Sequence, residues 1–218
     1  QELQQSSLSV IDGLIDGIYA AEQNDPAKDD SNCLDIERVD LQGDILIPGL
    51  IDLHVHGCGG ADVMDAEPEA LTEVATALLK QGTTGFLATT MTAPNSRLET
   101  AIKRTVAQTL SCCAAELLGF HLEGPCLSER YRGAQKIIAQ REVPLINSQV
   151  KLITIAPELP EAEAYFTLAE DLSIVLSVGH SAASYEQMLS AINRGVSYLT
   201  HAFNAMPGIH HRNPGLLT

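Results

Sequence analysis

The chain has 218 residues, of which 45% are hydrophobic, so it can bury a substantial core as one large domain or as one domain with a small appendage. Its formal net charge of -15, from 13 Lys and Arg against 28 Asp and Glu, argues against a nucleic-acid partner and against binding to an anionic membrane. No apolar run approaches the roughly 18–20 residues of a membrane span, and the N-terminus lacks the pattern of a signal peptide, so we expect a cytoplasmic protein.

The N-terminal part has a short, strand-like pattern. The stretches SLSVIDGLIDGIYA and LDIERVDLQGDILI flank the acidic, turn-rich segment EQNDPAKDDSN. We interpret residues 1–47 as part of a small β-sandwich module. From residue 48 onward the pattern changes to apolar strands, polar turns and amphipathic helices in alternation, which marks residues 48–218 as a second domain.

The second domain begins its alternation with a helix predicted over residues 68–81, where apolar residues recur at helical spacing. A buried strand, TTGFLATT, follows it, then a helix near residues 97–110 and the strand ELLGFHLEG. After a long loop we predict, in order, the strand KLITIAPEL, a helix around 161–170, the strand SIVLSVGHS, a helix around 185–194 and the strand VSYLTHAFNAM.

Strands that are almost continuously apolar and alternate with helices indicate parallel pairing with both faces covered. Either a doubly wound sheet or a (β/α) barrel satisfies this pattern. The segment GCGGAD is glycine-rich but lacks the GxGxxG spacing of a phosphate loop. Histidines and a glutamate instead lie at the carboxyl ends of four predicted strands, the first of them in LIPGLIDLHVHG, where a barrel gathers its active-site residues. The pattern therefore favours a (β/α) TIM-type barrel, incomplete over these residues.

Five of these residues form a candidate metal site. His54 and His56 in LHVHG lie two apart, so on a strand both side chains point to the same side. A carboxylate such as Glu123, at the end of an apolar strand, is seldom buried unless it is paired or bound to a metal. His180 and His201 follow two later strands. Four imidazoles and one carboxylate suit zinc or iron, with room for one or two ions, and indicate a hydrolase.

Other interpretations remain open for each residue taken alone. His54 and His56 also fit an exposed polar turn, and a single buried histidine such as His180 or His201 is more often a hydrogen-bonded core residue than a ligand. His121 shares the strand face of Glu123 and is expected to support a ligand rather than to be one. His210 and His211 lie in a loop and are expected to be solvated.

The motifs resemble a known family. PGLIDLHVHG is similar to the first-strand signature of the amidohydrolase superfamily. HLEGP, VGHS and THAFNAMPGIHHRNPG, in that order, resemble the N-acetylglucosamine-6-phosphate deacetylase family, and the resemblance runs from about Gly43 to the last residue. It implies metal-dependent hydrolysis of the acetamido group of N-acetylglucosamine 6-phosphate, which yields glucosamine 6-phosphate and acetate.

The resemblance also implies roles for the metal-site residues. Glu123, His180 and His201 match the ligands of the family's principal metal. His54 and His56 match the pair that holds a second ion in some members, so this sequence resembles the branch that binds two. Zinc is the favoured ion and iron is the alternative.

On the substrate side, the resemblance implies that the backbone of Ala134 contacts the substrate and that Asn204, Ala205 and Arg212 bind its phosphate. The planar guanidinium of Arg212 suits a phosphate because it donates two parallel hydrogen bonds, although an exposed loop arginine is the plain alternative. Gln135 departs from the family, which usually has a histidine facing the reacting carbonyl at that position.

The sequence contains roughly six strand and helix units, where a closed barrel needs eight. The resemblance places the catalytic aspartate beyond Thr218, together with a phosphate-contacting histidine that is donated across a dimer interface, so a homodimer is expected at full length. The chain is thus expected to be either a fragment or a truncated, inactive metal-binding remnant. The remaining alternatives are N-acetylgalactosamine-6-phosphate deacetylase and an amidohydrolase acting on a cyclic amide or a nucleobase.

Overall fold

The structure, a computed structural model, describes residues 6–20, 37, 39–65, 67, 69–106, 113–138, 143 and 148–218. The chain divides into two compact units, Gln1–Pro48 and Gly49–Thr218. In the first unit, strands β1 (Ser6–Ile11) and β2 (Leu14–Ala20) form an antiparallel hairpin. The two turn residues have positive φ angles, 50° at Asp12 and 77° at Gly13, as a tight hairpin turn requires. The β-sandwich module over residues 1–47 stays a prediction.

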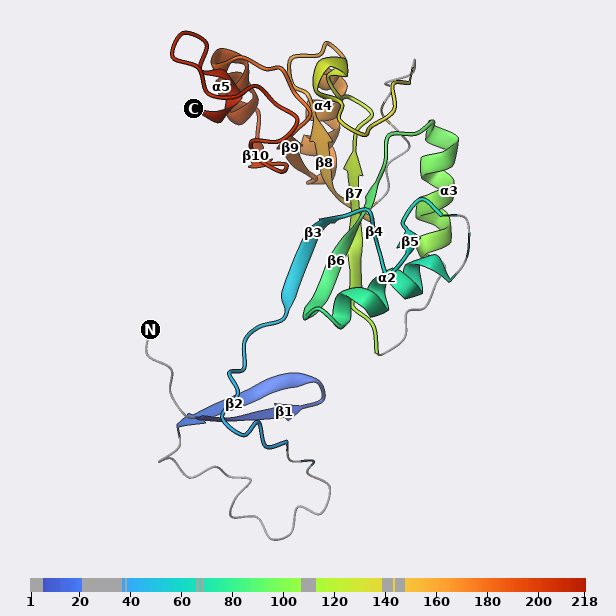
Figure 1. Ribbon diagram of the computed structural model, residues 1–218, viewed down its shortest axis with the longest axis vertical. Helices are drawn as coiled ribbons and strands as arrows, with labels where there is room; N and C mark the ends of the chain where they lie inside the picture. Colours follow the sequence, from blue (N-terminus) through green and yellow to red (C-terminus); the bar gives the residue numbers. More distant parts are fainter. Residues whose placement is uncertain are drawn as a thin grey trace. The chain divides into compact units, whose positions relative to one another are not determined.

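The second unit is built on one curved, fully parallel sheet (Figure 1). Its six strands are β3 (Leu50–Val55), β6 (Thr83–Thr90), β7 (Glu116–Glu123), β8 (Val150–Ile155), β9 (Val175–Val178) and β10 (Val196–Leu199). Their order across the sheet is their order in the chain. A doubly wound sheet reverses its strand order part-way across, whereas a barrel adds each strand on the same side. The predicted (β/α) barrel type is confirmed, with six parallel strands in the described part of the chain.

Helices follow the strands as the alternation predicts. They are α2 (Ala70–Leu79), α3 (Asn95–Val106), α4 (Ala162–Leu172) and α5 (Tyr185–Asn193). α2 packs against β6, α4 against β9 and α5 against β10. Two antiparallel strands of two residues each, β4 (Gly57–Cys58) and β5 (Ala61–Asp62), lie between β3 and α2 in the chain and contact α2. Among the described residues, every helix is too short or too polar to cross a lipid bilayer.

The apolar residues whose spacing predicts the helices are the residues that the helices bury. In α2, Leu71, Val74, Ala75 and Leu78 are buried, at the spacing of one helical face. α5 begins at a capping box, in which Ser184 accepts a hydrogen bond from the backbone of Gln187 and the Gln187 side chain accepts one from the backbone of Ser184. The helix predicted over 68–81 therefore lies at Ala70–Leu79, while residues 107–110 of the helix predicted after it lie outside the described residues.

Three strands are shorter than predicted. KLITIAPEL, SIVLSVGHS and VSYLTHAFNAM continue past the observed ends of β8, β9 and β10. The reason is visible in the backbone at two of these ends, because His180 and His201 have positive φ angles of 49° and 32°. A residue in that region cannot continue an extended strand. At β9 and β10, strand structure therefore stops before the apolar sequence does, and the turn that follows places a histidine over the edge of the sheet.

Candidate metal centre

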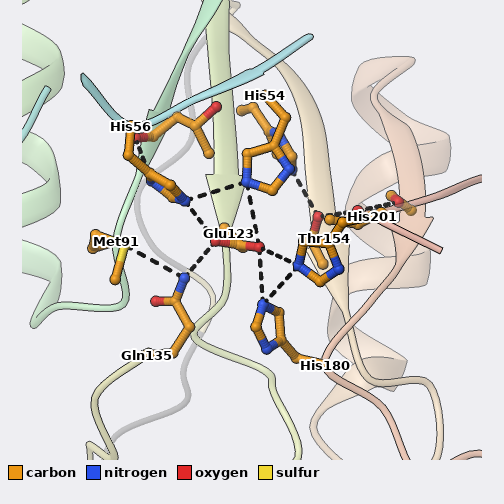
Figure 2. Close-up of polar contacts among 12 residues, drawn as sticks. His54, His56, Met91, Glu123, Gln135, Thr154, His180 and His201 are labelled. Carbon is orange, nitrogen blue, oxygen red and sulfur yellow. Dashed lines mark hydrogen bonds and ion pairs between the residues drawn. The ribbon is translucent and has the colours of Figure 1, made fainter. Parts of the chain in front are cut away.

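Five predicted site residues meet at the carboxyl-terminal edge of the parallel sheet (Figure 2): His54, His56, Glu123, His180 and His201. His54 lies near the end of β3 and Glu123 is the last residue of β7. His180 and His201 each lie two residues beyond a strand, after β9 and β10. Because all strands run in the same direction, their carboxyl ends meet at one edge and bring these distant residues together.

Glu123 lies at the centre of the cluster and is only 2% exposed. Its Oε1 atom is 3.0 Å from Nε2 of His180, 3.2 Å from Nε2 of His201 and 3.5 Å from Nε2 of His54. Its Oε2 atom is 3.0 Å from Nε2 of His56. Two three-residue groups share this carboxylate, His54–His56–Glu123 and Glu123–His180–His201, and within each group the ligand atoms lie within 4.8 Å of one another. The arrangement matches a carboxylate that bridges two ion positions.

Two of the imidazoles have a defined tautomer. Nδ1 of His56 lies 3.1 Å from the carbonyl oxygen of Thr89, and Nδ1 of His180 lies 2.8 Å from that of Tyr131. Because a carbonyl oxygen only accepts, each Nδ1 carries a hydrogen and donates it. In the neutral rings Nε2 then presents a lone pair to the Glu123 carboxylate, which is favourable only with a proton or a metal ion in between. Such backbone-anchored imidazoles are typical of metal ligands, so these residues fit a divalent cation.

The electrostatics of the cluster favour positive charge. Burial alone would raise the pKa of Glu123, but hydrogen bonds from the four surrounding imidazoles outweigh it and hold that pKa well below its usual range. The hydrogen bond to Glu123 raises the pKa of His201. Burial opposes protonation of His56, yet the hydrogen bond and the charge of Glu123 raise its pKa overall. Without a metal, the ionised carboxylate therefore favours protonation of His56 and His201.

The backbone at the ligands is strained. Besides His180 and His201, the non-glycine residues Phe203 and Ala205 have positive φ angles, of 76° and 53°. Conformations of this kind cost of order 1–3 kcal/mol each and cluster at active sites. Nδ1 of His201 is buried and has no hydrogen-bond partner among the described residues. The backbone conformation that places His201 at the cluster therefore destabilises the segment after β10 locally.

His121 lies beside the cluster and supports it through a chain of buried hydrogen bonds. Its Nδ1 donates to the carbonyl oxygen of Leu53 at 3.0 Å, and its Nε2 lies 2.7 Å from the hydroxyl of Thr154. That hydroxyl is 2.7 Å from the hydroxyl of Thr200, which is 2.5 Å from that of Ser177. Burial, followed by the charge of His54, lowers the pKa of His121 to about 3, so the ring is neutral near pH 7.

One direction of donation satisfies this whole chain. Neutral His121 donates from Nδ1, so its Nε2 accepts from Thr154, which accepts from Thr200, which accepts from Ser177. The hydroxyl chain was not foreseen in the sequence. Its only signal there is a single Ser or Thr in each of three short, mostly apolar stretches, LITIAP, LSVGH and YLTHA.

Gln135 reaches the cluster in a way that the sequence did not indicate. Its side-chain nitrogen donates a hydrogen bond to Oε2 of Glu123 and lies 3.5 Å from Sδ of Met91. The resemblance implied a position that faces the reacting carbonyl of the substrate. In this structure the amide contacts the candidate ligand carboxylate itself.

The predicted substrate-binding residues are mostly exposed. Ala134, Asn204 and Arg212 are exposed and Ala205 is half-buried. Ala134 directly precedes Gln135, so its backbone lies next to the cluster. A cavity of about 280 Å³ has none of the four in its lining; it is lined by Asp62, Met64, Asp65, Met91, Thr92, Ala93, Pro94, Arg97 and Lys136. The roles of the four residues stay predictions. His210 and His211 are exposed, as expected.

Comparison with known proteins identifies the family. The model of the amidohydrolase family matches residues 45–214, a range that includes every residue of the cluster. The chain belongs to the amidohydrolase family. Amidohydrolases are typically enzymes that use divalent metal ions, which agrees with the donor set described above.

The chain is also similar to individual proteins of known name and structure. The chain is 37% identical over 193 residues to N-acetylglucosamine-6-phosphate deacetylase of Lysinibacillus sphaericus, covering 84% of this chain and 50% of the relative. It is 31% identical over 215 residues to N-acetylgalactosamine-6-phosphate deacetylase of Escherichia coli O157:H7, covering 94% and 54%. The crystal structure of N-acetylglucosamine-6-phosphate deacetylase from Pasteurella multocida superimposes with a TM-score of 0.83 at 30% identity, covering 99% and 57%. The chain spans about half the length of the curated relatives it matches.

Proposed function

We propose that the cluster of this amidohydrolase binds one or two divalent ions, zinc in preference to iron, and that the whole protein deacetylates N-acetylglucosamine 6-phosphate to glucosamine 6-phosphate and acetate. The observation that carries the proposal is the buried Glu123 carboxylate between two imidazole pairs. The names of its relatives, N-acetylglucosamine-6-phosphate deacetylases from several organisms, support the substrate.

The residues of this chain have separable tasks in that reaction. When bound, the ions acidify a water molecule and polarise the acetamido carbonyl. Glu123, His180 and His201 hold the principal ion, and His54 and His56 hold the second. The carbonyl oxygens that anchor the imidazoles keep Nε2 aimed at the centre, so the ligand geometry exists before an ion arrives.

The substrate is held on the exposed side of the cluster. The backbone of Ala134 contacts the sugar, and Asn204, Ala205 and Arg212 bind the phosphate. Arg212 is exposed and its guanidinium has no hydrogen bond or ion pair among the described residues, so its donors are available to an anion. The proton-transferring aspartate is predicted beyond Thr218, and the homodimer and the cytoplasmic location are predictions for the whole protein.

The galacto epimer is the second candidate substrate. A relative named N-acetylgalactosamine-6-phosphate deacetylase aligns with 94% of this chain. The two substrates differ in the orientation of one hydroxyl group.

The test is a paired assay with the full-length, zinc-loaded protein. Acetate release is measured from N-acetylglucosamine 6-phosphate, from its galacto epimer and from unphosphorylated N-acetylglucosamine. We expect the highest kcat/KM with the phosphorylated gluco sugar and the lowest without the phosphate. Faster turnover of the galacto epimer would favour the second candidate. Activity on cyclic amides alone would contradict both, and zinc uptake without any turnover would indicate a metal-binding remnant.

A further inference from the structure

Gln135 is a buried polar residue in the loop that follows the short helix η1 (Glu129–Tyr131). It is 3% exposed, although its neighbours in the chain are exposed on both sides. Its backbone nitrogen donates to the carbonyl oxygen of Arg132 at 2.9 Å, and Nη1 of Arg132 donates to the carbonyl oxygen of Gln135 at 3.1 Å. These two contacts fix the backbone from which the Gln135 side chain extends toward the cluster.

The orientation of the Gln135 amide follows from its partners. Its Oε1 atom accepts a hydrogen bond of 2.8 Å from the backbone nitrogen of Thr92. A backbone N–H only donates, so the amide oxygen must face Thr92 and the NH₂ group must face Glu123. In the flipped orientation, two donors would meet at Thr92 and two acceptors would meet at Glu123. The NH₂ group of Gln135 therefore donates a hydrogen bond to the Glu123 carboxylate (Figure 2).

Three residues close a ring of hydrogen bonds around the carboxylate. Thr92 donates its backbone N–H to Gln135, Gln135 donates to Oε2 of Glu123, and the Thr92 hydroxyl donates to the backbone carbonyl of Glu123 at 3.3 Å. The ring ties the side chain of Glu123 to its own backbone through two other residues. Rotation of the carboxylate would break it.

In this orientation the two carboxylate oxygens of Glu123 face different neighbours. Oε2 faces His56 and Gln135, whereas Oε1 faces His180, His201 and His54. Gln135 carries no charge, so it orients the carboxylate without neutralising it. A lysine or arginine at this position would compete with a cation for the same negative charge.

Building on the proposed metal site, we propose that Gln135 is a positioning residue, which closes a hydrogen-bonded ring with Thr92 and Glu123 and thereby holds Oε2 of the carboxylate toward His56 and Oε1 toward the other three imidazoles. Loss of its donor frees the carboxylate to rotate away from one ion position. Removal of such an outer partner typically lowers metal affinity by about 10–100-fold.

The test is a zinc titration of the purified full chain against a competing chelator, with zinc content by elemental analysis. Gln135→Met keeps the length of the side chain and removes the donor; we expect its zinc affinity to fall by about 10–100-fold. Gln135→His restores one N–H donor and one acceptor in the same ring, and should recover most of that loss. Met91→Leu is the matched control, because Met91 touches the same amide but not Glu123, and it should bind zinc like the wild type.

Thermal melting of the metal-free proteins shows whether each variant is folded. If Gln135→Met does not fold, Gln135→Asn takes its place: it keeps an amide but is one methylene too short to span Thr92 and Glu123, and the same loss is expected.

Two results would overturn the role of Gln135 and leave the metal site standing. The first is wild-type affinity in Gln135→Met. The second is an equal loss in Gln135→His or in Met91→Leu, because packing rather than the donor would then explain the effect. A wild-type chain that takes up no zinc would overturn the proposed metal site itself, and the assignment of Gln135 with it.

Discussion

The Nε2 atom of His180 lies 3.0 Å from the Oε1 atom of Glu123, although the other nitrogen of that ring already carries the hydrogen that it donates to a backbone carbonyl. In the neutral ring, two acceptors would face each other at hydrogen-bond distance. A positive charge between the two atoms removes this repulsion, and four imidazoles arranged around one carboxylate suit a divalent ion in that role.

Metal removal should destabilise the protein. A ligand that binds only the folded state at about 100 times its dissociation constant adds about 2.7 kcal/mol, which raises Tm by about 5–10 °C in a chain of this size. We expect that shift between chelator-treated and zinc-loaded protein in differential scanning fluorimetry. Magnesium serves as the control, because an imidazole-rich site binds it poorly. Equal melting temperatures with and without zinc would contradict the metal site.

Glu123→Gln should abolish zinc binding in both groups, because each of them uses an oxygen of this carboxylate. The measurement is zinc content by elemental analysis after dialysis. Glu170→Gln, on the exposed side of α4, removes the same charge outside the cluster and should leave zinc content unchanged. Normal zinc content in Glu123→Gln would exclude the carboxylate as a shared ligand.

His54→Ala tests for the second ion. It removes one ligand of the His54–His56–Glu123 group and none of the Glu123–His180–His201 group, so zinc content should fall from two ions to one per chain. His201→Ala should remove the ion of the other group. A wild type with one ion per chain whose content is unchanged in His54→Ala would contradict binding of two ions.

Thr154→Val should destabilise the fold because it breaks the buried hydroxyl chain in its middle. The methyl group neither donates to His121 nor accepts from Thr200, so two buried polar groups lose a partner, each worth about 1–3 kcal/mol. We expect the free energy of unfolding, measured by urea denaturation, to fall by at least about 1 kcal/mol.

The control for this change is Thr167→Val on the exposed face of α4, where the hydroxyl bonds only to the carbonyl oxygen of Glu163 in its own helix. It should change the free energy of unfolding by no more than about 0.5 kcal/mol. Similar values for Thr154→Val and Thr167→Val would mean that the buried chain contributes nothing measurable to stability.

The elements predicted most accurately are those with a strong local signal. TTGFLATT forms a strand over its whole length, and α2 and α5 lie within two residues of their predicted bounds, because apolar periodicity and capping act over a few residues. The ends of β8, β9 and β10 were predicted too late. Their apolar sequence continues, but at β9 and β10 the positive φ angles of His180 and His201, which lie two residues further on, prevent the strand from continuing.

The sequence by itself determined the parallel α/β class, through the alternation of apolar strands and amphipathic helices, and the residues at the strand ends favoured a barrel over a doubly wound sheet. Tertiary structure decided which atoms meet. Glu123 is separated by 57 residues from His180 and by 78 from His201, so their contact depends on the strand order and curvature of the whole sheet. The ring through Gln135 also required the structure, because a hydrogen bond depends on the direction of each donor, and direction is set by backbone positions far apart in the chain.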